Sequence, residues 1–321
     1  MNIAFLISVY KDPAQLKRLI NALQGDGSHF FIHVDKKVDV NSFLQICPEF
    51  HADNQSLTYL EKRFPVYWGG FSQVQYQFAM LDAAINSNTT FDRFVIITGQ
   101  DFPLIPRLKI FEEFSKNSKK EYITGYNLSN SPEKTNQLEL IQIYHFFRDF
   151  YPFSQKTVNV FSGISRRLMK ILPIRKKAYL KINEKKWDIY KSSSYMAITG
   201  ECAKYIHQQM QNKTIINYFK WSCIPEEFFI PTILFNSDFA TNAEIIKTGK
   251  YPGLQKLSAI TYFNYDDIIK VFDENDIDEL ENSKKIFARK FASSKSEKLI
   301  EELQKKCRTT NINNTKGVKN A

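Results

Sequence analysis

The sequence predicts an α/β fold in which helices flank a mainly parallel central sheet. Short apolar runs alternate with helical patterns through the N-terminal half, as they do in successive βα units. The 321 residues are 43% hydrophobic and 14% aromatic, which is enough to bury a large core. Residues 307–321 have little to bury, so we expect one domain over residues 1–306 and a frayed tail after it.

The elements of the N-terminal half follow from the spacing of apolar residues. We expect strands at 2–9, 30–34 and 94–97, a helix that starts near Pro13, and a second helix around 74–85. Asp35 and Asp101 follow the second and third of these strands, at the edge where open α/β sheets bind ligands. A nucleotide pocket is one interpretation of these carboxylates, and caps for the following turns are the other.

The C-terminal half gives weaker patterns. Residues 125–190 are rich in Asn, Ser and Lys, and we expect loops and basic helices there. A strand at 195–198 and a helix at 200–210 follow. The triplet Asp276-Ile277-Asp278 has the form of a metal-binding motif. It stands in a polar run typical of a helix start, where acidic side chains interact favourably with the helix dipole.

Composition narrows the class of protein. The four cysteines are scattered without metal-ligand spacing, and we expect reduced thiols. No apolar run approaches the roughly 20 residues of a membrane-spanning helix. The net charge of +10 is concentrated in two segments. Arg166 to Lys191 has ten Lys and Arg against two acidic residues, and Lys284 to the C-terminus has eleven against three, so both segments favour anionic partners.

Two adjacent carboxylates, Glu226 and Glu227, follow Pro225 within an apolar stretch. Proline followed by glutamates suits the first turn of a helix, and capping electrostatics is the simple explanation. Neighbours on a helix point about 100° apart, so only one carboxylate needs to face solvent. The other, partly buried with a raised pKa, would suit a general base for a sugar hydroxyl.

Arg289 and Lys290 lie between aromatic residues in the run 287–291. In a strand their side chains point to opposite faces, so one packed cation can be aimed at phosphate; an exposed basic strand is the alternative. The chain has no Gly-rich phosphate loop, which disfavours a dehydrogenase or a kinase.

Six short motifs then fall into a known order. They are His-Val-Asp-Lys at 33–36, Val-Tyr-Trp-Gly-Gly-Phe-Ser at 66–72, Thr-Gly-Gln-Asp-Phe-Pro-Leu at 98–104, Ser-Ser-Ser-Tyr at 192–195, Pro-Glu-Glu at 225–227 and Phe-Ala-Arg-Lys-Phe at 287–291. With them the sequence resembles the Core-2/I-branching β-1,6-N-acetylglucosaminyltransferases and their relatives, the peptide O-xylosyltransferases, from residue 3 to about 292. The resemblance implies a GT-A-like fold and an inverting reaction without divalent metal or other cofactor. It also implies a nucleotide-binding half at about 1–125 and an acceptor and catalytic-base half at 126–306.

The resemblance assigns five residues to a UDP-sugar donor. Asp35 would contact the uracil, with Ser8 and Val9 lining the base. Lys290 would bind the β-phosphate in place of a metal, and Asp101 would lie near the donor sugar.

One donor contact of the family has no secure counterpart here. Asp267 stands near the place of the second phosphate-binding cation, and Lys270 or Arg289 are the candidate substitutes. Residue 261, often Arg in relatives, is Thr261.

On the acceptor side, Glu227 matches the general base of the family and Glu226 its acidic neighbour. Tyr265 stands where relatives carry an acceptor-stacking Trp. The basic cluster of the mammalian enzymes is replaced by Leu-Ile-Gln-Ile at 140–143, so the mammalian acceptor is not expected.

The predicted function is transfer of a sugar from a UDP-sugar to a hydroxyl of a glycan or lipid-linked saccharide. The predicted sugar is N-acetylglucosamine, and xylose is the alternative. The membrane anchor and disulfide cysteines of the animal enzymes have no counterpart, so we expect a bacterial-type, cytoplasmic relative.

The basic segment at 166–177 mixes its cations with Leu, Met and Ile. It predicts peripheral contact with an anionic membrane, and a solvated basic helix is the alternative. A non-enzymatic protein that binds nucleic acid or an anionic surface is the alternative from another class. No nucleic-acid module accompanies the charge, so no nucleic-acid partner is expected.

Overall fold

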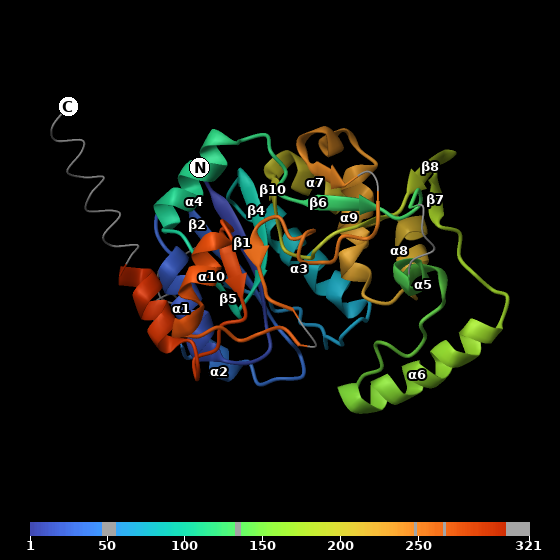
Figure 1. Ribbon diagram of the computed structural model, residues 1–321, viewed down its shortest axis with the longest axis horizontal. Coiled ribbons are helices and arrows are strands. Elements are labelled where there is room, and N and C mark those ends of the chain that lie inside the picture. The colour runs from blue at the N-terminus through green and yellow to red at the C-terminus, as the bar shows by residue number, and fades with distance from the viewer. Residues whose placement is uncertain (47–55, 132–135, 247–248, 266–267, 306–321) are drawn as a thin grey trace.

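The N-terminal apolar runs form the central sheet of the protein (Figure 1). The computed structural model describes residues 1–46, 56–131, 136–246, 249–265 and 268–305. The sheet has the order β10-β4-β1-β2-β3. Its parallel strands are β1 (Ile3–Val9), β2 (Ser28–Val34), β3 (Leu57–Tyr59) and β4 (Arg93–Thr98), and β10 (Met196–Thr199) runs antiparallel to β4. The predicted α/β fold with a mainly parallel central sheet is confirmed.

The register of the parallel strands brings their carboxyl ends to one level. Val9 of β1 pairs with Val34 of β2, and Ser8 pairs with Thr98 of β4. The residues that follow these strands therefore emerge side by side, as the sequence predicted for Asp35 and Asp101.

Helices cover both faces of the sheet. On one face lie α1 (Pro13–Leu23) and α4 (Arg107–Lys116), and on the other lie α3 (Ser72–Ile85), α7 (Gly200–Gln209) and α9 (Phe229–Phe235). The helix α1 begins at Pro13 as predicted, and Asp12 caps it by accepting a hydrogen bond from the Gln15 backbone. The four apolar residues that predicted this helix, Leu16, Leu19, Ile20 and Leu23, are all fully buried.

The C-terminal basic run forms the middle strand of a separate three-stranded sheet. The strand β13 (Phe287–Arg289) pairs antiparallel with β5 (Asp101–Pro103) and parallel with β12 (Thr261–Tyr262). The remaining helices are α2 (Asn41–Leu44), α8 (Lys213–Phe219), α10 (Ile277–Asn282) and the 3-10 helices Pro225–Glu227, Asp238–Asn242 and Glu274–Asp276. The predicted tail at 307–321 lies outside the described residues, and the single domain over 1–306 stays a prediction.

Residues 125–190 differ from the prediction. They contain α5 (Asn136–Gln142) and α6 (Gln155–Ile171), but also strands β7 (Tyr179–Ile182), β8 (Lys185–Asp188) and β9 (Tyr190–Lys191). The strand β6 (Thr124–Asn127), at the start of this region, pairs with β9 and with β11 (Glu244–Ile246). The prediction that this region holds only loops and basic helices was wrong. Strands of two to four residues are too short for an alternation of apolar and polar residues to be recognised.

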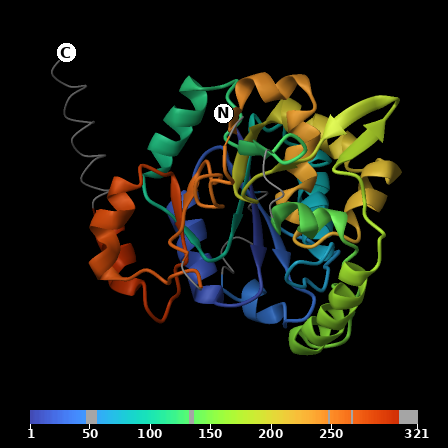
Figure 2. The same cartoon turned by 45° about the vertical axis from the view of Figure 1, so that its right-hand side comes forward.

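The helix α6 lies at the outer edge of the molecule in both ribbon views (Figures 1 and 2). No helix in the described ranges has the length and apolarity needed to cross a bilayer. Cys202 and Cys223 are buried and unpaired, while Cys47 and Cys307 lie outside the described residues.

Candidate functional site

The segments that follow β1, β2 and β4 are joined by backbone hydrogen bonds. Asp35 N donates to Val9 O at 2.8 Å, and Gly99 N donates to Ser8 O at 3.0 Å. A Cβ at Gly99 would lie 2.6 Å from Val9 Cγ1, so glycine allows the two segments to approach this closely. The structure therefore brings together Ser8, Val9 and Asp35, which the resemblance assigned to the nucleoside.

The Asp35 side chain is buried and held in one orientation. Its Oδ1 accepts hydrogen bonds from Lys37 N at 2.9 Å and Val66 N at 3.3 Å, and its Oδ2 pairs with Lys37 Nζ at 2.9 Å. Asp35 thus links two of the six motifs, at 33–36 and 66–72. Its contact with uracil stays a prediction.

Asp101 is fully buried and faces Arg289 across the β5–β13 pair. Its oxygens accept hydrogen bonds from Thr98 N at 2.9 Å and Thr98 Oγ1 at 3.0 Å, and Arg289 Nε lies 3.6 Å away. Burial raises the pKa of Asp101, against the opposing effects of Arg289 and the Thr98 hydrogen bonds. Asp101 therefore positions Arg289, whose guanidinium lies over the Tyr195 ring at 4.7 Å, and its predicted contact with a donor sugar is untested.

Lys290 is the cation best placed for phosphate. Its ammonium is half-buried and has no carboxylate partner within the described ranges. Burial, Arg289 and Lys11 all lower its pKa, in that order of effect. Backbone bonds from Lys290 N to Lys270 O at 3.1 Å and from Phe272 N to Lys290 O at 2.9 Å fix the chain on both sides of it. The Lys290 ammonium is thus available to pair with an anionic ligand such as a phosphate.

The candidates for the second phosphate-binding cation differ in whether a carboxylate already pairs with their charge. Lys270 contacts Asp276 and lies 3.6 Å from Glu279, so its charge is already neutralised. Arg289 is partly neutralised by Asp101. Lys11, which the sequence argument missed, is exposed just after β1 and acts on Lys290. The sequence feature that could have identified Lys11 is its position two residues after the end of a strand. Asp267 lies outside the described residues.

The two glutamates lie in a 3-10 turn, Pro225–Glu227, as a short form of the predicted helix start. Four backbone bonds hold this turn: Ile224 N to Gly69 O at 3.1 Å, Glu227 N to Ile224 O at 3.1 Å, Phe228 N to Pro225 O at 3.0 Å, and Ser192 N to Glu227 O at 2.9 Å. The motifs at 66–72 and 192–195 are thus both hydrogen-bonded to the segment 224–227, which contains the third motif, at 225–227.

Glu227 is the more accessible carboxylate of the pair. Its side chain is 13% exposed, and Lys191 Nζ lies 2.5 Å from its Oε2. Lys191 is itself 3% exposed, and its ammonium lies 4.8 Å from the centroid of the Phe228 ring. Sequence reasoning missed Lys191, although it immediately precedes the motif at 192–195. The ion pair with Lys191 fixes the position of the Glu227 carboxylate.

Glu226 is buried, and its Oε2 has no hydrogen-bond partner in the described part of the chain. Burial and then the charge of Glu227 raise the pKa of Glu226 well above its usual range, against the weaker effect of Lys191. The raised pKa expected for one of the pair therefore falls on Glu226, the residue assigned to the acceptor. A buried acid without a partner is available to a substrate hydroxyl.

The buried Tyr76 connects the two sides of the site. It forms a hydrogen bond with Ser8, and burial raises its pKa to about 12. Glu226, Arg289 and Asp101 also act on this ionisation, so all three lie near the same side chain. Its ring stacks on His33 with centroids 5.2 Å apart. The donor segments and the glutamate turn are therefore neighbours in the fold.

Tyr265 is less closely tied to these groups. Its side chain is 57% exposed, and its backbone forms an isolated bridge to Ile269. It stands on a surface loop, and its predicted stacking on an acceptor stays untested.

The metal-like triplet has a structural role. Asp273 and Asp276 form a capping box at the start of the turn before α10, so the helix-start interpretation is confirmed. Across the described ranges, no group of three His, Cys, Asp or Glu side chains could hold a metal ion.

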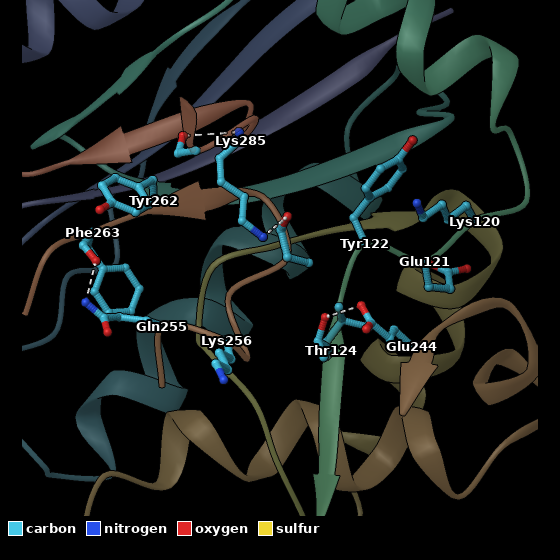
Figure 3. A pocket seen from close by; sticks show the side chains of 13 residues that line it. Lys120, Glu121, Tyr122, Thr124, Glu244, Gln255, Lys256, Tyr262, Phe263 and Lys285 are labelled. Carbon is cyan, nitrogen blue, oxygen red and sulfur yellow. Dashed lines mark hydrogen bonds between the residues drawn. The ribbon is translucent and has the colours of Figure 1, made fainter. Parts of the chain in front are cut away.

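A pocket of about 530 Å³ lies elsewhere on the molecule (Figure 3). None of the predicted site residues lines it. Several of its polar groups already have partners. Lys285 Nζ donates to Ser258 O at 2.8 Å, and the Glu121 carboxylate binds the backbone and hydroxyl of Thr199. The pocket is therefore not the site that the motifs predict.

Comparison with known proteins agrees with the motifs. The family model described as Core-2/I-Branching enzyme matches residues 3–251. Human N-acetyllactosaminide beta-1,6-N-acetylglucosaminyl-transferase is 21% identical over 326 residues, which cover 98% of this chain and 74% of that protein. Rat xylosyltransferase 2 is 29% identical over 133 residues, or 41% of this chain and 15% of that protein. This chain thus matches only a small part of the length of the xylosyltransferases.

Similarity to solved structures is weaker. A 4-diphosphocytidyl-2C-methyl-D-erythritolsynthase from Anaerococcus prevotii superposes with a TM-score of 0.38 at 11% identity, over 88% of this chain and 95% of that one. The family model covers most of the chain and five of the six motifs, and the run at 287–291 lies beyond its match. The chain belongs to the Core-2/I-branching enzyme family.

Proposed function

We propose that this protein transfers a sugar from a UDP-sugar to a hydroxyl of a glycan acceptor, with inversion at the anomeric carbon. Membership of the family supports glycosyl transfer. The observation that carries the proposal is the state of Lys290. It is half-buried beside Lys11 and Arg289, at the carboxyl ends of parallel strands and without a carboxylate partner in the described residues. A diphosphate is an anion that such a group of cations can bind.

Glu227 is the proposed base. It accepts the proton of the acceptor hydroxyl while that oxygen bonds to the anomeric carbon. The bond from this carbon to the β-phosphate oxygen breaks, and its electron pair leaves with UDP. Lys290 stabilises the charge that develops on the diphosphate. Attack opposite the departing UDP inverts the configuration. Lys191 holds the Glu227 carboxylate, and Glu226 is available to bind an acceptor hydroxyl.

The proposed reaction uses fixed cations where other enzymes use a divalent metal. Lys290 and Lys11 are the cations that take this role, and Arg289 lies close to Lys290. The only acidic triplet considered as a metal motif is occupied by helix capping and by Lys270. Activity is therefore expected to persist in excess chelator.

The donor sugar is proposed to be N-acetylglucosamine. The human relative, which matches nearly the whole chain, is named for transfer of that sugar. Xylose is the second candidate, because the xylosyltransferases match over a shorter region with higher identity. The acceptor is proposed to be a glycan or a lipid-linked saccharide in the cytoplasm. The predicted membrane contact depends on a different surface, formed by α6 and the loop before it.

A donor screen tests the proposal. Purified protein is incubated with a panel of UDP-sugars, with and without EDTA, and released UDP is measured. We expect release from UDP-N-acetylglucosamine that EDTA does not reduce, and addition of a saccharide acceptor should increase it. A strict requirement for manganese would contradict the role of Lys290, and release from UDP-xylose alone would select the second candidate.

A further inference from the structure

The helix α6 buries its small side chains and exposes its large apolar ones. Val158, Ser162 and Ser165 face the protein. The exposed apolar residues are Val160 at 57%, Phe161 at 46%, Ile164 at 53%, Leu168 at 57% and Ile171 at 82%. At 100° per residue these five side chains fall within one quarter to one third of the helix circumference. An ordinary surface helix has the opposite arrangement, with its large apolar side chains facing the core.

Aromatic side chains of the preceding loop extend this exposed stripe. Phe147 lies 6.5 Å from the Phe161 ring centroid and 5.8 Å from that of Phe150, which in turn stacks on Phe153 at 5.0 Å. All four rings belong to side chains that are more than 40% exposed. A continuous apolar surface of this kind is a usual mark of an interaction site.

The loop is held firmly on the body of the protein. Tyr67 Oη donates to Phe153 O at 2.7 Å, and Trp68 N donates to Gln155 Oε1 at 2.8 Å. The Asp149 carboxylate accepts hydrogen bonds from the backbone and hydroxyl of Ser72. The aromatic side chains are therefore exposed on a fixed backbone, and their exposure is a property of the fold.

The charge around the stripe is of one sign. Residues 155–177 contain seven Lys and Arg and no Asp or Glu. Four of the seven are engaged: Lys170 pairs with Glu139, Lys176 is buried against Tyr218 and Ser222, Arg175 binds carbonyls at the end of α6, and Lys177 lies over the Tyr179 ring. Lys156, Arg166 and Arg167 are exposed and have no carboxylate partner in the described ranges. An occupant of this surface must offer both negative charge and an apolar interior.

A second copy of the chain does not meet this requirement. A two-fold symmetric contact through α6 would place the same unpaired cations opposite each other. A bilayer that contains anionic lipid offers phosphates at the level of the cations and acyl chains beneath them.

We propose that α6 and the aromatic loop at 147–153 dock this protein on an anionic lipid bilayer. The α6 surface, as we call Phe147, Phe150, Phe153, the five exposed apolar residues of α6 and Lys156, Arg166 and Arg167, also adjoins the glutamate turn. Its loop is bonded to the segment 67–72, and Gly69 O accepts from Ile224 N, three residues before Glu227. Docking thus places lipid headgroups beside the acceptor side of the site. If the proposed glycosyl transfer is correct, a lipid-linked saccharide is the acceptor class that this arrangement serves.

Co-sedimentation with vesicles tests the docking without any substrate. Full-length protein is mixed with vesicles of phosphatidylcholine alone or with one-third phosphatidylglycerol. We expect binding to the anionic vesicles only, with strong weakening when salt is raised. Lys156→Gln/Arg166→Gln/Arg167→Gln should bind about a hundredfold more weakly, since each cation near the surface contributes about fivefold. Ile164→Ser/Leu168→Ser/Ile171→Ser should also lose binding.

Matched variants separate docking from general charge and from misfolding. Lys116→Gln/Lys119→Gln/Lys204→Gln removes three exposed cations from other elements and should bind like the wild type. Leu108→Ser, at another exposed apolar side chain, should do the same. Thermal unfolding of each variant confirms that it is folded.

Equal binding to both kinds of vesicle, or no binding to either, would overturn the proposal. So would dimerisation that depends on Ile164, Leu168 and Ile171 while vesicle binding does not. The result is independent of catalysis. An inactive protein that still binds anionic vesicles would contradict only the proposed transfer, and an active protein that does not bind them would contradict only the docking.

Discussion

The strand-end site and the α6 surface differ in how their charged side chains are buried and paired. At the strand ends, Asp35, Asp101 and Arg289 are buried, and each has a partner that fixes its direction. On the α6 surface, Lys156, Arg166 and Arg167 are exposed without carboxylate partners in the described residues, beside large exposed apolar side chains. The first arrangement suits recognition of individual atoms. The second suits a ligand that is extended and fluid, for which total charge and area matter more than geometry.

The largest expected effect is the loss of the base at the strand-end site. Glu227→Gln should lower turnover by about 10² to 10⁴, because a positioned base supplies about that much, while the Kd for UDP changes little. The melting temperature should fall, because the buried Lys191 loses its carboxylate partner. Glu226→Gln should retain more turnover, since burial raises the pKa of Glu226 and an amide can still form a hydrogen bond with a substrate hydroxyl. Initial rates of UDP release with an acceptor present measure both. Near-normal turnover of Glu227→Gln would refute its role.

The two regions should also differ in how they respond to truncation. Leu19→Ala in α1 should lower the free energy of unfolding by about 2 to 5 kcal/mol, because the side chain is fully buried. Ile164→Ala in α6 should change it by less than about 0.5 kcal/mol, because that side chain is 53% exposed. Urea unfolding compares the two. A large loss for Ile164→Ala would mean that α6 is part of the core.

A smaller effect is expected at the phosphate-binding cation. Lys290→Met should weaken UDP binding by about 10- to 100-fold, the contribution of a charge-assisted hydrogen bond. Lys270→Met is the matched control and should have a much smaller effect, because Lys270 is already neutralised by Asp276 and Glu279. Calorimetry with UDP distinguishes them. Equal losses in the two variants would remove the special role of Lys290.

The pH dependence of stability should report the buried side of the strand-end site. His33 is fully buried and its Nε2 accepts from Phe64 N, and burial lowers its pKa from 6.5 to about 4. Between these values the unfolded chain binds a proton and the folded chain does not, so stability falls as the pH drops from 6.5 to 4. The contribution is of the order of 3 kcal/mol.

Melting temperatures between pH 7 and pH 4 measure this slope. His33→Leu is expected to be less stable at pH 7, because Phe64 N loses its acceptor, but to show a shallower dependence. His145, whose pKa burial also lowers to about 4, should account for part of the remaining slope. An unchanged slope in His33→Leu would contradict the assignment.

The predictable part of the fold is the part whose apolar pattern matches its burial. Leu16 and Leu19 lie on a stripe that is fully buried, so the spacing of α1 was sufficient to place it. In α6 the apolar spacing is also regular, but the stripe faces outward. Periodicity shows that a helix has two faces, and it does not show which face packs. The strands β6 to β9 were missed because they are short and pair in small sheets.

The candidate site was predictable where motifs identified it. Arg289 and Asp101 were assigned separately, and the structure pairs them across β5 and β13. Lys191 and Lys11 could not be predicted, because a single lysine beside a strand end is common and its neighbours come from distant segments. Lys191 reaches Glu227 only because the backbone of Ser192 is bonded to Glu227 O.

Gly70 lies where the aromatic loop at 147–153 is bonded to the segment 67–72. A Cβ on this residue would lie 2.1 Å from Asp149 Oδ1, so any side chain here would expel the carboxylate that fixes the aromatic loop to Ser72. The neighbouring Gly69 holds the turn that leads to Glu227. Two consecutive glycines thus lie between the aromatic loop at 147–153 and the turn that carries Glu227. A substitution at position 70 would break the link between the aromatic loop and the glutamate turn without changing any of the proposed catalytic residues.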